Sequence, residues 1–122
     1  MSNIDWSKLI TKAMKDAAAA ALHMSEMKAE LASRNTSAAA QITRIQDRID
    51  TIGYGIESGE ADEADEAEMA ALALVLPKWK SYKFSLGKVT AQASWPSAPK
   101  WPVAPPIPEI AASPMRGALD AV

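Results

Sequence analysis

The clearest pattern in the chain is a set of isoleucines spaced alternately by three and four residues. They are Ile42, Ile45, Ile49, Ile52 and Ile56. This spacing places them on one side of a helix, as in the a and d positions of a coiled coil. We predict that this isoleucine seam is buried, either in a hairpin within the chain or between copies in a homo-oligomer. Arg44 and Arg48 are among the polar residues expected on the outer face.

An alanine-rich segment before the seam predicts a helix that begins near Asp5 or Ser7, either of which can cap it. We expect the chain to turn at residues 33–36, although nothing in that Ser-Arg-Asn-Thr segment forbids a continuous helix. The glycines at positions 53, 55 and 59 predict a second turn, because three glycines within seven residues usually break a helix.

A second apolar stripe follows the glycine-rich turn. Acidic residues open it, and Asp62 followed by Asp65 fits a variant of the capping box. The stripe continues at helical spacing through Met69, Leu72, Leu76, Trp79, Tyr82 and Leu86. Pro77 interrupts this stretch, so we expect a helix that is bent or restarted there and that ends near Gly87.

The C-terminal segment is rich in proline and tryptophan. Seven of the eight prolines lie between Trp95 and Pro114, which excludes a helix and favours extended backbone. Trp95 and Trp101 either fold back onto the helices of the chain or rest against a partner. The predicted fold is therefore mainly α, with two to three helices in a hairpin or coiled-coil-like arrangement, followed by an extended tail.

This reading divides the chain into four regions. An alanine-rich helical region with the isoleucine seam covers residues 1–56, and a glycine-rich turn covers 57–61. A motif helix covers 62–89, and the extended Pro/Trp-rich tail covers 90–122.

Composition argues against several kinds of function. The chain has no cysteine, and its net charge of −2 gives no bulk attraction to nucleic acid. No apolar run approaches the length of a membrane span. His23 is the single histidine, and its pairing with Glu26 makes a poor metal site. No catalytic motif is present, so we expect a non-enzymatic protein without cofactor or metal, and with neither nucleic acid nor membrane as partner.

The aromatic and basic helix together with the tail resembles the C-terminal signature of phage tail fibre assembly proteins. The resemblance covers about residues 62–108, and the order of its two segments is the specific part. The matching positions are Trp79, Lys80, Tyr82, Lys83, Leu86, Lys88, Val89, Trp95, Pro96 and Pro99.

The resemblance implies a chaperone that binds the C-terminal tip of a tail fibre and assists its folding and trimerisation. It implies activity in the host bacterial cytoplasm during phage assembly. The alternative is a structural adaptor or cap retained on the fibre tip of the virion. The residues expected to contact the fibre, or to hold the chaperone together, are Trp79, Tyr82, Lys83, Leu86, Trp95, Pro96, Trp101 and Pro102.

Overall fold

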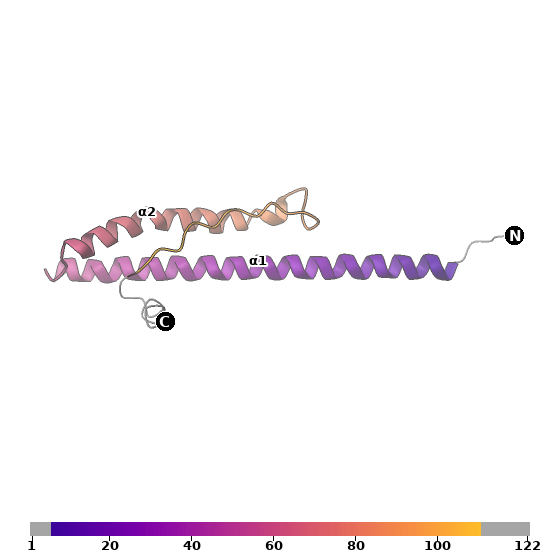
Figure 1. Ribbon diagram of the computed structural model, residues 1–122, viewed down its shortest axis with the longest axis horizontal. Helices are drawn as coiled ribbons and strands as arrows, with labels where there is room; N and C mark the ends of the chain where they lie inside the picture. The colour runs from indigo at the N-terminus through magenta and orange to yellow at the C-terminus, as the bar shows by residue number, and fades with distance from the viewer. Residues whose placement is uncertain (1–5, 111–122) are drawn as a thin grey trace.

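Two helices of very different length form an antiparallel hairpin (Figure 1). The computed structural model describes residues 6–110. Helix α1 spans Trp6–Glu57, helix α2 spans Glu63–Leu86, and a short 3-10 helix, η1, spans Val89–Ala91. No strand occurs within residues 6–110. The predicted mainly α fold is confirmed, in its two-helix form.

Helix α1 is continuous through residues 33–36, so the turn expected there is wrong. None of these four residues is glycine or proline, and polar residues alone do not end a helix. Arg34 instead bonds Glu30 one turn earlier, with 2.7 Å between Nε and Oε1. Such a pair at positions i and i+4 supports the helix it spans.

The helix also continues past Gly53 and Gly55 to Glu57, and Gly59 closes its C-terminal turn. The Glu60 N–H donates to the Gly55 carbonyl at 2.8 Å, and the Gly59 N–H donates to the Ile56 carbonyl at 3.1 Å. These two bonds form a Schellman motif, which places the residue after the helix in the left-handed region. Gly59 has φ +76° there, while Gly53 and Gly55 have no positive φ. The expected break at Gly53 is therefore wrong, because only the third glycine has the conformation that ends the helix.

The start and end of α2 agree with the sequence prediction. The Asp65 N–H donates to the Asp62 carboxylate at 2.9 Å, and the Asp62 N–H donates to the Asp65 carboxylate at 3.1 Å. The capping box is thus confirmed, and Gly87 is the C-cap. The helix runs without interruption through Pro77, so a restart at this residue is wrong.

The core lies between the two helices and includes most of the isoleucine seam. Ile45 and Ile52 are buried, and Ile42 and Ile49 pack partly buried against the core. Ile56 is 43% exposed, so its expected burial is wrong. Helix α1 ends one residue later, at Glu57. The turn that follows brings Ala61 beside Gly55, where an added methyl group would lie 3.5 Å from the Ala61 Cβ. The isoleucine seam is therefore buried within the hairpin of a single chain, which is one of the two arrangements predicted.

Helix α2 supplies the other side of the core with its apolar stripe. Its buried residues are Leu72, Leu76, Trp79, Tyr82 and Leu86. Beside the stripe, Arg48 of α1 bonds the Glu68 carboxylate through Nε at 2.8 Å and Nη2 at 3.1 Å. This pairing raises the pKa of Arg48, chiefly through the hydrogen bond to Glu68. Arg48 thus bridges the helices, and its predicted place on the outer face is wrong.

Candidate partner-binding surface

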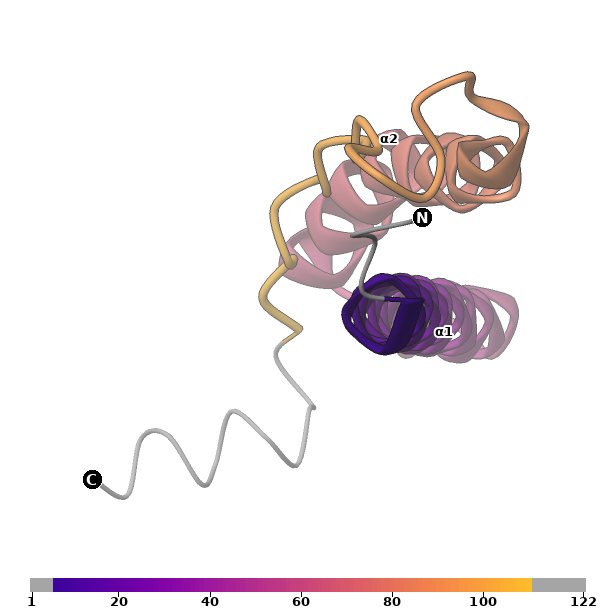
Figure 2. The ribbon, with the colours of Figure 1, turned by 90° about the vertical axis from the view of Figure 1, so that its right-hand side faces the viewer.

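The tail folds back along the hairpin towards the turn between the helices (Figures 1 and 2). Its contacts progress along α1, from His23 beside Pro96 to Arg34 beside Trp101 and Arg44 beside Pro108. Residues 93–97 form turns, and the chain from Pro99 to Ile110 has no regular secondary structure. The tail therefore turns beside His23 and then runs along α1 as far as Arg44.

Side chains of the hairpin donate hydrogen bonds to carbonyl groups of the tail. The donors are His23 Nε2 to Pro96 at 2.7 Å, Trp79 Nε1 to Pro106 at 3.3 Å and Arg44 Nη2 to Pro108 at 2.9 Å. Proline has no N–H, so a proline-rich segment cannot satisfy its carbonyls by pairing with itself. These contacts fix the tail in one position on the hairpin, and Ile110 at its end is part of the core.

A loop closed by Gln92 holds the first tryptophan-proline pair. The Gln92 side chain donates to the Lys100 carbonyl at 2.8 Å and accepts from the Lys100 N–H at 2.7 Å. The loop includes Trp95 and Pro96, both half-buried. The glutamine thus brings the two ends of the loop together and sets where the following chain begins.

Trp95, Trp101 and Arg34 form a cluster over α1. The two indole rings meet edge to face, with centroids 6.3 Å apart and an interplanar angle of 86°. The Arg34 guanidinium lies over Trp101, with Cζ 4.5 Å from the ring centroid, which is cation–π geometry. Burial lowers the pKa of Arg34, but hydrogen bonding to Glu30 and the nearby Tyr82 outweighs it, so the pKa is raised. Arg34 therefore holds a cation over Trp101.

Three of the predicted contact residues lie in the chain's own core. Trp79 and Tyr82 are only 3% and 6% exposed, and Leu86 is fully buried. The Trp79 and Tyr82 rings pack edge to face, with centroids 5.6 Å apart. Lys83 is exposed, and Trp95, Pro96, Trp101 and Pro102 are half-buried. Within this set, the side chains most accessible to another molecule belong to α2's outer face and to the tail.

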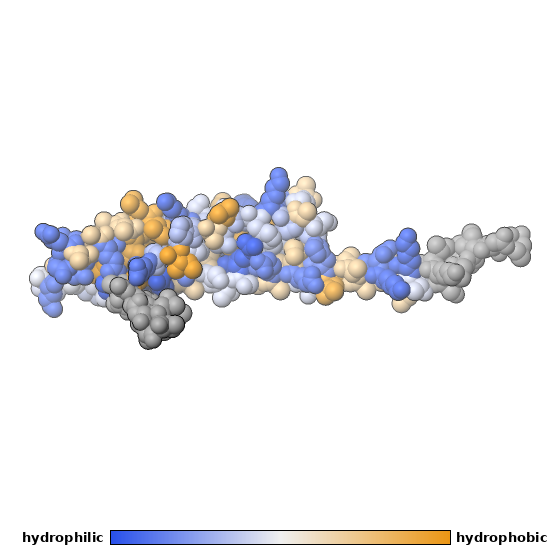
Figure 3. All heavy atoms as spheres, in the orientation of Figure 1, coloured by the Kyte–Doolittle hydropathy of each residue, from blue (hydrophilic) through white to orange (hydrophobic). Residues whose placement is uncertain are grey.

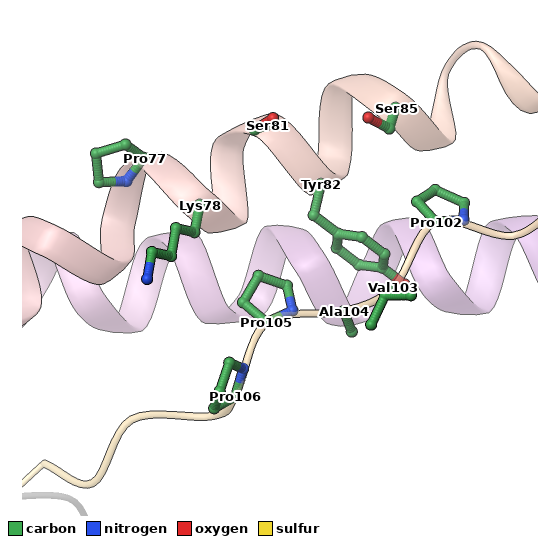
Figure 4. A pocket seen from close by; sticks show the side chains of 10 residues that line it. All are labelled: Pro77, Lys78, Ser81, Tyr82, Ser85, Pro102, Val103, Ala104, Pro105 and Pro106. Atoms are coloured by element: carbon green, nitrogen blue, oxygen red, sulfur yellow. The ribbon is translucent and has the colours of Figure 1, made fainter.

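A groove of about 590 Å³ lies between α2 and the tail (Figure 4). Residues from Pro77 to Ser85 line one side, and residues 102–106 line the other. Tyr82 points across it towards Val103, which is 91% exposed. Phe84 and Ile107 are large exposed apolar side chains on the same two segments, outside the lining of the groove. The two segments therefore present apolar surface to solvent.

The chain segment that forms both walls of the groove is basic. Residues 69–108 contain five lysines and no acidic residue, whereas residues 57–68 contain seven acidic residues and no basic one. Lys78, Lys80 and Lys83 are all exposed on α2. Because exposed charge steers encounters between proteins, this surface favours partners that carry acidic groups.

Neither helix within the described range is long and apolar enough to cross a membrane. Between residues 6 and 110 no three His, Asp or Glu side chains group in a way that could hold a metal ion. Comparisons of the chain with protein-family models, curated proteins and solved structures find no match.

Sequence reasoning missed the residues that fix the tail, namely His23, Arg34, Arg44 and Gln92. Arg44 was assigned to the outer face, and His23 was paired with Glu26. A signal was available for His23 and Arg34, which lie on the side of α1 that also carries Met24, Met27 and Leu31. Polar side chains beside an apolar stripe can donate hydrogen bonds to the carbonyls of a neighbouring segment whose prolines have no N–H groups.

Proposed function

We propose that the protein is a tail fibre assembly chaperone. It binds the C-terminal tip of a phage tail fibre and assists its folding and trimerisation in the cytoplasm of the host bacterium. The proposal is supported first by the aromatic and basic motif of residues 79–89 and the tryptophan-proline segment that follows. This order resembles that of the tail fibre assembly proteins.

The single observation that carries the proposal is the open, largely apolar groove between α2 and the tail, with Lys78 in its lining. Its walls come from the two segments in which the resemblance lies. Trimeric fibres rich in β structure fold slowly and expose apolar surface and unpaired strand edges before they close. A partner surface of this kind fits the exposed Val103 in the groove and the exposed Phe84 and Ile107 on the segments that form its walls. The exposed lysines of α2 lie on one of these segments.

The core positions of Trp79, Tyr82 and Leu86 assign them a supporting role in this proposal. They fix α2 against α1 and hold the wall of the groove in place. Val103, Lys83 and Phe84 then make the contact with the fibre, and the cluster of Trp95, Trp101 and Arg34 anchors the opposite wall.

Co-expression with a tail fibre protein of the same phage, followed by pull-down of the fibre, tests the proposal. Val103→Asp should reduce fibre recovery in the soluble fraction severalfold, because it puts a carboxylate into an apolar contact without touching the core. Ala40→Asp is the control, since Ala40 is also exposed but lies on α1 away from the groove. Equal recovery of soluble fibre with both variants would contradict the groove as the contact.

Mass spectrometry of purified particles separates the chaperone from a retained cap. A chaperone is absent from the particle, and its deletion removes functional fibres. A structural cap is present in fixed proportion to the fibre.

A further inference from the structure

The side of helix α2 that faces away from α1 is exposed along its whole length. We call it the outer face, and it lies opposite Trp79, which is buried in the core. Leu74 is 73% exposed and Phe84 69%. The face follows helical spacing, and its residues are all exposed: Glu63, Glu66, Ala70, Ala73, Leu74, Pro77, Ser81, Phe84 and Lys88. Large apolar side chains thus lie in water on a helix whose other side packs in the core.

The charges on the outer face are separated by sign. Glu63 and Glu66 lie at its start, and Lys80 and Lys88 lie towards its end. Between them, residues 69–77 carry no charge. Figure 3 shows hydrophobic residues over α2 and hydrophilic ones at the turn that precedes it. The outer face therefore has an apolar middle between an acidic end and a basic end.

The helix dipole explains part of this order, since it favours acidic residues at the start of a helix and basic residues at its end. The dipole sets no requirement on which side of the helix these residues lie. It also gives no reason for the exposure of Leu74 and Phe84, because apolar side chains are stabilised by leaving water. A contact that covers the apolar middle and pairs the charged ends accounts for both observations.

The order of charges makes the outer face complementary to a copy of itself in one orientation. Two parallel α2 helices would set glutamates against glutamates and lysines against lysines, which is repulsive. Two antiparallel helices set each acidic end against a basic end and bring the apolar middles together. With a two-fold axis between Leu74 and Pro77, Leu74 of one chain faces Pro77 of the other. The same axis sets Glu63 opposite Lys88.

We propose that the protein forms an antiparallel dimer in which a second copy of the chain covers the outer face of α2. Helix α1 lies on the other side of α2, so the two hairpins can meet with both α1 helices outermost (Figure 2). The 24 residues of α2 are about 36 Å long. Phe84 and Pro77 also belong to the surface proposed for the fibre, so the dimer is the form without bound fibre. Its existence does not depend on the proposed function.

The first test compares one substitution at two exposed helix positions. Ala73→Lys puts a cation in the middle of the outer face, and Ala40→Lys puts it on α1, away from this face. By sedimentation equilibrium we expect wild-type protein and Ala40→Lys to be dimers. Ala73→Lys should raise the dissociation constant about a hundredfold or more, because the cation would be buried without a partner in the contact. Circular dichroism should show the same helix content in all three.

The second test reverses the charges at one end of the outer face at a time. Glu63→Lys with Glu66→Lys makes both ends basic, and Lys80→Glu with Lys88→Glu makes both ends acidic. Each double variant alone should dimerise about tenfold more weakly than wild type, because like charges then meet at both ends. A mixture restores opposite charges at both ends. An affinity-tagged copy of one double variant should therefore retain the other double variant well and its own untagged form poorly.

Three results would overturn the inference. The first is a wild-type protein that is monomeric at all accessible concentrations, and the second is equal association of Ala73→Lys and wild type. The third is a tagged double variant that retains its own untagged form as well as it retains the oppositely charged one, because the ends of the outer face would then not meet in the dimer.

Discussion

Trp101 lies where the tail, α1 and the core meet. Arg34 covers one face of its ring, the Trp95 ring lies edge to face with it, and Trp101 packs against the core cluster. The residue thus has a structural role in addition to any contact with a partner. Its substitution tests how firmly the tail is bound to the hairpin.

We expect Trp101→Ala to lower the free energy of unfolding by about 2 kcal/mol, less than for a fully buried tryptophan because the ring is half-buried. Trp101→Phe keeps an aromatic face under Arg34 and should lose less. Urea unfolding followed by circular dichroism measures both. Equal midpoints for Trp101→Ala and wild type would mean that the tail is not held at this ring.

Ile45 and Ile56 belong to the same sequence pattern but have different surroundings. Ile45 is fully buried, so Ile45→Ala should cost about 2–5 kcal/mol of stability. Ile56→Ala should cost under about 1 kcal/mol, because much of this side chain is already in water. Chemical unfolding of the two variants gives the comparison. If Ile56→Ala lost more stability than Ile45→Ala, the Ile56 side chain would have to make a contact that the hairpin does not show.

At the scale of elements, helix boundaries depend on backbone conformation rather than on glycine content. Gly59→Ala should destabilise the hairpin by about 1–2 kcal/mol, since Gly59 has φ +76°. Gly53→Ala should stabilise α1 by about 0.5–1 kcal/mol, because the new Cβ meets no atom within 4 Å. Thermal melting of both variants should show shifts of opposite sign. Shifts of the same sign would contradict the role of Gly59 in ending α1.

The elements also show what sequence can predict. The capping box at Asp62, the buried stripe of α2 and the burial of Ile45 follow from local spacing, and local spacing is visible in a sequence. The continuity of α1 was missed because residues 33–36 are polar without being helix breakers. The path of the tail was missed for a different reason. Its direction depends on His23, Arg34 and Arg44, which bond groups far away in the chain.

At the scale of the whole molecule, the tail is part of the folded unit. A chain that stops after Ala98 loses Trp101 and Ile110 from the core and the acceptors of Trp79 and Arg44. We expect a lower unfolding midpoint and increased binding of a hydrophobic dye. A chain that stops after Ile110 keeps every contact described above and serves as the control. If both shortened chains are equally stable, the tail contributes nothing to the hairpin.

The position of Ile110 also has a consequence for biosynthesis. The core takes side chains from α1, from α2 and from the far end of the tail, so its last member is translated well after both helices. During translation the nascent hairpin contains Trp79 and Tyr82 before the tail segment of residues 102–110 can pack beside them. Residue 110 must therefore leave the ribosome before the fold can close, and a product cut short before it would leave Trp79 and Tyr82 less well covered.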